Sequence, residues 1–214
     1  MFAGGRAGST CVFRTFSRHG ERRRRGLPSR AERDSIAAAL YLRSKYGEDA
    51  FSEILRKFSK WTAKKSTWGA ITLGSRLSYV DFQAYQAIVY DKAALVLNML
   101  RDMMGDEKFF AGLRQFFARY RHGAASTAQF RAVMEAAAGG SLEGFFDPWF
   151  NSHELPEVRV SESVERRGGR TFLRVRVSQS GRSFVFPLWV AWNGAAGEPH
   201  REKVLVDQRA QEFE

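Results

Sequence analysis

The chain has 214 residues, and 44% of them are hydrophobic, including 18 Phe and 5 Trp. This composition supports a buried core and excludes a wholly disordered chain. The formal net charge of +11 is unevenly placed, because residues 1–30 hold eight arginines and one acidic residue, Glu21. The remaining residues carry only +4. Nucleic-acid binding by the body of the protein is therefore not expected.

Residues 1–33 form a basic, irregular leader that mixes Gly, Ser and Arg without hydrophobic periodicity. Three interpretations remain open: a disordered arm, a mitochondrial presequence, or a start that is not the natural one. The run Arg22–Arg25 could bind nucleic acid or acidic lipid, but no aromatic residues interleave it. A solvated arm is favoured over a nucleic-acid site.

The sequence contains a single cysteine, Cys11, so a disulfide within the chain is impossible. No apolar run approaches the ~18–20 residues of a membrane span. The first residues, Met1 to Arg6, lack the apolar core of a signal peptide. We expect no transmembrane segment and no export by this N-terminus. The compartment stays undetermined, and the cytoplasm is favoured over the alternatives.

Residues 34–153 show helical patterns joined by short loops. Ser35–Lys45 is rich in Ala and Leu and ends near Gly47, a usual residue after a helix. The next helix has apolar residues three and four apart, which predicts one buried face. These residues are Phe51, Ile54, Leu55, Phe58 and Trp61.

Residues 65–80 have no periodicity and are interpreted as an ordered loop. The helix that follows, from Tyr85 or Tyr90 to Met104, is apolar on most sides, as is typical of a helix inside a core. Further helices are predicted after Gly105, after the capping-box residues Ser126 and Gln129, and from Leu142 to Phe150.

After Pro156 the hydrophobic period changes from 3.6 to 2, which predicts antiparallel strands. Gly168–Gly169 and Ser180–Gly181 are the expected turns. The alternating residues are Val158 and Val160; Leu173, Val175 and Val177; Phe184 to Trp192; and Val204 and Val206. We therefore predict an α+β protein with domains 34–153 (helical) and 154–214 (a small β-sandwich).

Tyr90 is the candidate for chemistry. From the residues alone, a tyrosine at the head of an apolar helix is most often a core residue with a satisfied hydroxyl. However, Tyr90-Asp-Lys-Ala-Ala-Leu, followed by Met-Leu and by Gly105-Asp-Glu-Lys-Phe, resembles a segment of the aminopeptidase N family of zinc metallopeptidases. The family has Tyr-x-Lys-Gly-Ala there, so Ala93 replaces its usual Gly.

Other stretches extend the resemblance over residues 37–214. They are Ala38–Glu48, Leu73–Arg76, Phe146–Trp149 and Leu155–Val158. The resemblance implies the helical half of a thermolysin-like catalytic domain, followed by most of the family's β-sandwich, which is expected to be incomplete. It also implies that intact members use zinc to remove N-terminal residues from peptides.

The resemblance gives Tyr90 the role of stabilising the transition state. A neutral phenol near the peptide carbonyl oxygen can donate a hydrogen bond as negative charge develops there. Tyr85 matches a tyrosine of some members and is expected, at most, to support substrate binding.

The zinc ligands of the family cannot be assembled from this sequence. No His-Glu-x-x-His occurs in the 214 residues, and His153-Glu154 lacks a second histidine. Glu32 lies one position away from the family's third ligand, and His19 stands in an arginine-rich run. His122 and His200 are expected to be solvated. We therefore assign no metal ligands and predict that this chain alone binds no zinc.

Two functions follow as expectations. The first is a truncated aminopeptidase that is inactive alone, with residues 1–36 a frame-shifted or mis-assigned start. The second is a non-catalytic binding or scaffold module that keeps the fold. In either case apolar faces that normally pack against other parts of the enzyme would be exposed and would favour self-association.

Overall fold

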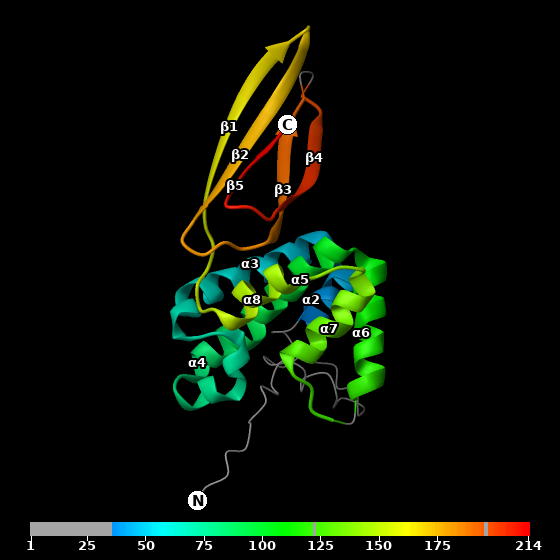
Figure 1. The fold of residues 1–214 in the computed structure, drawn as a ribbon, viewed down its shortest axis with the longest axis vertical. Helices are drawn as coiled ribbons and strands as arrows, with labels where there is room; N and C mark the ends of the chain where they lie inside the picture. Colours follow the sequence, from blue (N-terminus) through cyan, green and yellow to red (C-terminus); the bar gives the residue numbers. More distant parts are fainter. Residues whose placement is uncertain (1–35, 122, 195–196) are drawn as a thin grey trace, which may run out of the picture. The chain divides into compact units, whose positions relative to one another are not determined.

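The computed structural model describes residues 36–121, 123–194 and 197–214. The chain divides after His153 into a helical unit and a β unit (Figure 1). The α+β class predicted from the sequence is confirmed. The predictions for the basic leader, Cys11, His19, Glu32 and the side chain of His122 lie outside the described residues.

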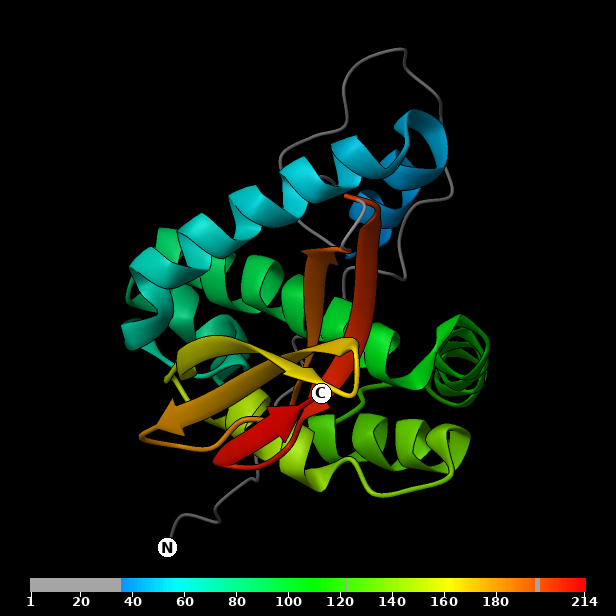
Figure 2. The ribbon, with the colours of Figure 1, turned by 90° about the horizontal axis from the view of Figure 1, so that it is seen from above.

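From Ile36 on, the helical unit consists first of two consecutive α-helices and a stretch of 3-10 turns. A long helix of mixed type and three further helices follow. The bounds are α2 (Ile36–Tyr46), α3 (Glu48–Lys65), η2 (Ser66–Trp68), η3 (Ile71–Tyr79), α4 (Phe82–Tyr85), the π-helix η4 (Gln86–Lys92), α5 (Ala93–Met104), α6 (Asp106–Tyr120), α7 (Thr127–Ala138) and α8 (Glu143–Asn151). α3 lies alongside the continuous α4–η4–α5 helix (Figure 2).

Local sequence signals set several of these boundaries. Gly47 and Gly105 separate consecutive helices and have φ values of 86° and 78°. Residues with a side chain rarely adopt such positive φ values. At the start of α7 the hydroxyl of Ser126 accepts a hydrogen bond from the Gln129 amide, and the Gln129 side chain accepts one from the Ser126 amide. This is the predicted capping box, and it satisfies amides that the helix leaves without partners.

The core of the helical unit is rich in aromatic rings. Phe116 of α6 contacts Phe130 of α7 edge to face, and Phe130 contacts Phe146 of α8. The ring of Phe146 stacks on that of Phe150 at 4.7 Å between centroids. Each of these four rings is almost fully buried. The apolar stripes of α6, α7 and α8 therefore meet in one cluster.

The segment interpreted as a loop contains 3-10 turns instead. Ile71, Gly74 and Leu77 of η3 are buried at a spacing of three, which is the period of a 3-10 helix. Gly74 has φ 56° and interrupts the helix. Such short pieces have no 3.6-residue period, and this explains why the pattern was missed.

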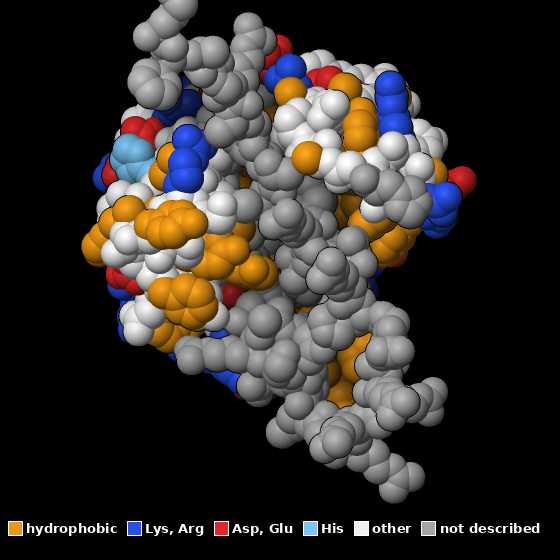
Figure 3. All heavy atoms as spheres, turned by 90° about the horizontal axis from the view of Figure 1, so that it is seen from below, with side chains coloured by type: hydrophobic (Ala, Val, Ile, Leu, Met, Phe, Trp, Pro, Cys, Tyr) orange, Lys and Arg blue, Asp and Glu red, His pale blue; other side chains and the backbone are white. Residues whose placement is uncertain are grey.

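The predicted stripe of α3 is only partly buried. Phe51 and Phe58 lie in the core, whereas Trp61 is 41% exposed. Exposed hydrophobic side chains also occur in the neighbouring segment: Tyr79 is 89% and Phe82 is 61% exposed. Figure 3 shows several hydrophobic side chains side by side on the face seen from below. No helix among the described residues is long and apolar enough to cross a membrane.

The β unit contains two antiparallel sheets. β1 (Glu157–Arg167), β2 (Arg170–Ser180) and β5 (Ala210–Phe213) form one sheet in the order β1-β2-β5. β3 (Phe186–Asn193) pairs with β4 (Pro199–Val206) in the other. Buried residues come from both sheets and from the preceding loop: Val175, Val177, Phe184, Phe186 and Val206. The short strand β5 was not predicted.

Candidate functional site

Tyr85 and Tyr90 come together on one side of a π-helical turn. Their hydroxyl oxygens lie 3.2 Å apart, and their rings meet edge to face at 5.4 Å between centroids. Residues five apart in a regular α-helix would be about 140° apart around the axis. The π turn closes i to i+5 hydrogen bonds and so brings this spacing onto one face. Both side chains are half-buried, and a ligand can therefore reach them.

The helix that carries the tyrosines has a charged start. The Asp81 carboxylate accepts hydrogen bonds from the Gln83 and Ala84 amides, at 2.7 and 3.0 Å, and caps α4. Lys65 at the end of α3 donates to the other oxygen of Asp81 at 2.8 Å. The Lys65 ammonium, with help from the two amides, holds the pKa of Asp81 below its usual value. The helix start is thus tied to α3.

Lys92, two residues after Tyr90, is a buried cation. Its side chain is among the most deeply buried, with 1% exposed, and its Nζ donates to the carbonyl oxygen of Ser152 at 3.0 Å. Ser152 follows the last residue of α8, where helix carbonyls lack partners and the helix dipole favours a cation. Burial lowers the pKa of Lys92 to about 8. The contact joins the π turn to α8.

A third contact supports the π turn from the side. The hydroxyl of Thr62, a buried residue of α3, donates to the Ala87 carbonyl oxygen at 3.4 Å. Ala87, Ile88 and Val89 are buried in the same turn. The tyrosine hydroxyls therefore project from a backbone that is fixed on its inner side, as a preorganised hydrogen-bond donor requires.

The described residues do not supply a metal site. No group of three or more His, Cys, Asp or Glu side chains within them is arranged to hold a metal ion. His153 and His200 are exposed, and His200 stacks on the Trp192 ring and lies 3.3 Å from a Glu198 oxygen. The donor set present in this part of the chain thus does not fit zinc, and we derive no chemical step through a metal.

The segment that carries Tyr85 and Tyr90 is similar to known proteins. A family model described as "Peptidase family M1 domain" matches residues 78–149, a range that includes the π turn and both tyrosines. Aminopeptidase N of Lactococcus lactis subsp. lactis is 26% identical over 127 residues, which are 58% of this chain and 15% of that protein. The mitochondrial aminopeptidase 2 of Saccharomyces cerevisiae is 24% identical over 136 residues, 62% of this chain and 14% of that protein.

These matches support an aminopeptidase N-like M1 family relationship for this chain. A part of the crystal structure of Legionella pneumophila aminopeptidase A has a similar fold, with a TM-score of 0.65 and 19% sequence identity. The match covers 83% of this chain and 20% of that one. The chain thus spans 15% or less of the curated M1 relatives described above and a fifth of the matched structure.

Within this M1 segment, the structure brings the two sequence-predicted tyrosines together. The assignment of Tyr90 as catalytic and of Tyr85 as substrate-binding stays a prediction. Sequence reasoning missed Lys92 and Asp81 as supports of the site. A lysine inside a nearly all-apolar helix was a usable signal for the first, and an Asp directly before a helix was one for the second.

Proposed function

We propose that this chain contributes the group that stabilises the transition state in an aminopeptidase N-like active site, and that this group is the hydrogen-bond donor Tyr90. The intact enzyme would release N-terminal residues from peptides. The observation that carries the proposal is the hydroxyl pair of Tyr85 and Tyr90 on the π turn, 3.2 Å apart. It lies within the segment that matches the M1 family.

The two hydroxyls suit unequal roles. A phenol that accepts a hydrogen bond from a second phenol is polarised and becomes a better donor. Tyr85 would donate to Tyr90, and Tyr90 would donate to the carbonyl oxygen of a peptide as that oxygen gains negative charge. Tyr90 is also closer to the buried anchor at Lys92. Tyr85 is then a positioning residue, and its loss should have the smaller effect.

We further propose that the chain is inactive alone and that the intact enzyme uses zinc. The ligands for the metal would have to come from residues other than the described ones. Purified chain incubated with zinc and aminoacyl p-nitroanilides should show no turnover above a protein-free control. Zinc-dependent hydrolysis that Tyr90→Phe abolishes would refute inactivity but not the assignment of Tyr90.

A segment exchange tests the role of Tyr90 directly. Residues 78–149 would replace the matching segment of Lactococcus lactis aminopeptidase N. If the exchanged enzyme is active, Tyr90→Phe should lower kcat by about 10²–10³-fold, as loss of one such donor does. Tyr85→Phe should lower kcat less. Tyr79→Phe is the matched control, because Tyr79 is 89% exposed and carries the same chemical change.

Each outcome of this exchange has a meaning. Equal effects of the Tyr90 and Tyr79 substitutions would remove Tyr90 from the mechanism. A raised KM with unchanged kcat for Tyr90→Phe would make it a binding residue instead. An inactive exchanged enzyme that folds would show that this segment cannot serve a peptidase, which contradicts the proposal.

A second candidate is a non-catalytic binding or scaffold module with the peptidase fold. It rests on the absence of His-Glu-x-x-His from the 214 residues. Metal analysis of purified chain distinguishes the two functions, because stoichiometric zinc favours an enzyme with unrecognised ligands. In both cases we propose that residues 34–153 correspond to the helical part of the catalytic domain and residues 154–214 to a β-sandwich.

The proposed function includes self-association through exposed apolar side chains. Tyr79, Val80 and Phe82 are all more than half exposed and lie close together in sequence. In a longer enzyme such a surface would contact other segments. A monodisperse monomer in solution would count against this part of the proposal.

A further inference from the structure

The outer edge of β1 has unpaired backbone groups at alternate residues. The amide of Gln179 donates to the carbonyl oxygen of Arg209, at 2.8 Å, so odd-numbered residues of β2 direct their backbone groups toward β5. Even-numbered residues of β2 therefore face β1, where they pair with odd-numbered residues. The even-numbered residues of β1 direct their backbone groups away from the sheet. These are Val158, Val160, Glu162, Val164 and Arg166.

The hairpin turn supports this assignment. Arg167 and Arg170 flank a two-residue turn at Gly168 and Gly169, whose φ values of 57° and 76° are those of a hairpin turn with both central residues left-handed. The flanking pair of such a turn exchanges hydrogen bonds, and Arg167 is odd-numbered. Both ends of the sheet thus give the same alternation.

The edge is long and accessible. All 11 residues of β1 are exposed except Glu165, which is partly buried. β1 is the end strand of the described sheet, whose order is β1-β2-β5. Val160 is 52% and Val164 is 65% exposed. An exposed edge strand with apolar side chains is a template for pairing with another strand.

We propose that the edge of β1 pairs with β1 of a second copy of this chain, antiparallel and centred on Glu162. The outward backbone groups of the two copies meet only where even-numbered residues of one strand lie opposite even-numbered residues of the other. Among such registers, the one centred on Glu162 overlaps all 11 residues. It is isologous, so each contact occurs twice around a two-fold axis.

Charge complementarity selects the same register. Glu157 meets Arg167 of the second copy, and Arg159 meets its Glu165. On the opposite face Val160 meets Val164. Moving the centre to residue 161 would oppose Glu157 with Glu165, and moving it to residue 163 would oppose Arg159 with Arg167. Like charges directly opposite each other destabilise a strand pair.

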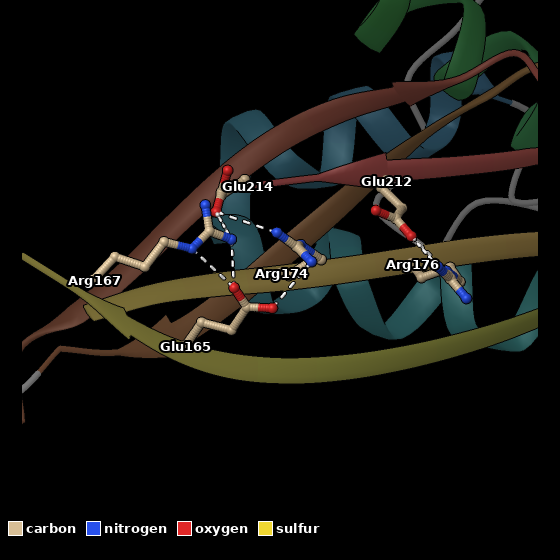
Figure 4. Close-up of polar contacts among 6 residues, drawn as sticks. All are labelled: Glu165, Arg167, Arg174, Arg176, Glu212 and Glu214. Carbon is tan, nitrogen blue, oxygen red and sulfur yellow. Dashed lines mark hydrogen bonds and ion pairs between the residues drawn. The ribbon is translucent and has the colours of Figure 1, made fainter. Parts of the chain in front are cut away.

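The paired edges would extend a charge ladder that is already present. Arg167 and Arg174 both bind Glu165 and Glu214, at 3.0 to 3.7 Å, and Arg176 binds Glu212 (Figure 4). All six side chains lie on the polar face of the β1-β2-β5 sheet. Arg159 also lies on this face, and it has no ion pair among the described residues. The second copy's Glu165 would supply one.

One contact in this register is unfavourable and gives a sharp test. Glu162 faces Glu162 of the second copy at the two-fold axis, so two carboxylates oppose each other there. Glu162→Gln should therefore tighten the dimer, while Arg159→Glu should weaken it about tenfold or more by turning two attractive pairs into repulsive ones. Arg114→Glu is the control, because it makes the same charge change on an exposed residue of α6.

The experiment is sedimentation equilibrium of the full chain and its three variants. The wild type should dimerise by about 0.1 mM, and Arg114→Glu should match it. Amide hydrogen exchange should show concentration-dependent protection at residues 158, 160, 162, 164 and 166 but not at the odd residues of β1. Circular dichroism checks that each variant is folded.

Several results would overturn the proposal. A monomer at about 0.1 mM excludes the dimer. A dimer that Arg159→Glu does not weaken must use another surface, such as the apolar side chains of Tyr79, Val80 and Phe82. Protection without the even-odd alternation, or a weaker dimer for Glu162→Gln, would exclude this register.

Discussion

Burial of Lys92 makes the stability of the helical unit depend on pH in a way that one substitution can isolate. The ordinary pKa of 10.5 falls to about 8 because burial disfavours the charged form. Below pH 8 the lysine is protonated in both the folded and the unfolded chain, and folding carries the full cost of burying the charge. Between pH 8 and 10.5 the unfolded chain binds the proton more tightly, so stability rises with pH.

The size of this effect follows from the pKa difference. A difference of about 2.5 between the folded and unfolded states corresponds to ~3 kcal/mol of stability that is missing at neutral pH and present above pH 10.5. Lys92→Met keeps the chain length and removes the charge. It also removes the hydrogen bond to Ser152, worth about 1 kcal/mol when the donor is neutral. We expect Lys92→Met to be ~2 kcal/mol more stable than wild type near pH 7.

Urea unfolding of both proteins at several values between about pH 7 and pH 10 measures the effect. The advantage of Lys92→Met should shrink steadily with pH and reverse near pH 10, because the wild type alone gains from losing the proton. Lys60→Met, at an exposed position of α3, controls for the loss of a lysine. A free-energy difference between Lys92→Met and wild type that stays constant over this range would refute the argument.

Two further predictions concern the packing of the helical unit. Ser126→Ala removes the capping box of α7 and should lower the free energy of unfolding by about 1 kcal/mol, whereas Ser126→Asp should lower it less, as measured by urea unfolding. Gly112→Val should cost ~1–3 kcal/mol, because a Cβ on Gly112 would lie 2.7 Å from the Met134 sulfur and 3.2 Å from the Ala137 Cβ. Because Met134 is itself buried, the test is a double-mutant cycle: Gly112→Val should cost less in the Met134→Ala background than in the wild type. An equal cost in both backgrounds would show that the contact between α6 and α7 is not the cause.

Periodicity predicted the elements whose burial follows a single face. The apolar residues of α3 that lie three and four apart and the alternating valines of β2 were sufficient, because each set repeats with the period of its element. The glycines at positions 47 and 105 and the cap residue Ser126 gave the helix boundaries, because a helix end depends on only a few neighbouring residues. Such local features can be read from a single sequence.

The π turn and the supports of the site could not be predicted in this way. A π turn differs from an α turn by one residue, and nothing local in Gln86–Lys92 marks the insertion. The i to i+5 spacing of Tyr85 and Tyr90 places them on different faces of the expected α-helix. Lys92 meets Ser152 across 60 residues of sequence, so its partner depends on tertiary packing.

These observations also explain how the helix accommodates Ala93 where the family usually has Gly. Ala93 is 3% exposed and adopts regular helical angles, φ −62° and ψ −38°. A residue with a Cβ at this position favours helix over the more flexible alternatives by about 1 kcal/mol relative to Gly. It lies between Lys92 and the apolar body of α5. The substitution therefore stiffens the junction that holds Tyr90, and Ala93→Gly should loosen the π turn while it keeps the amide hydrogen bond from residue 93 to the Tyr90 carbonyl oxygen.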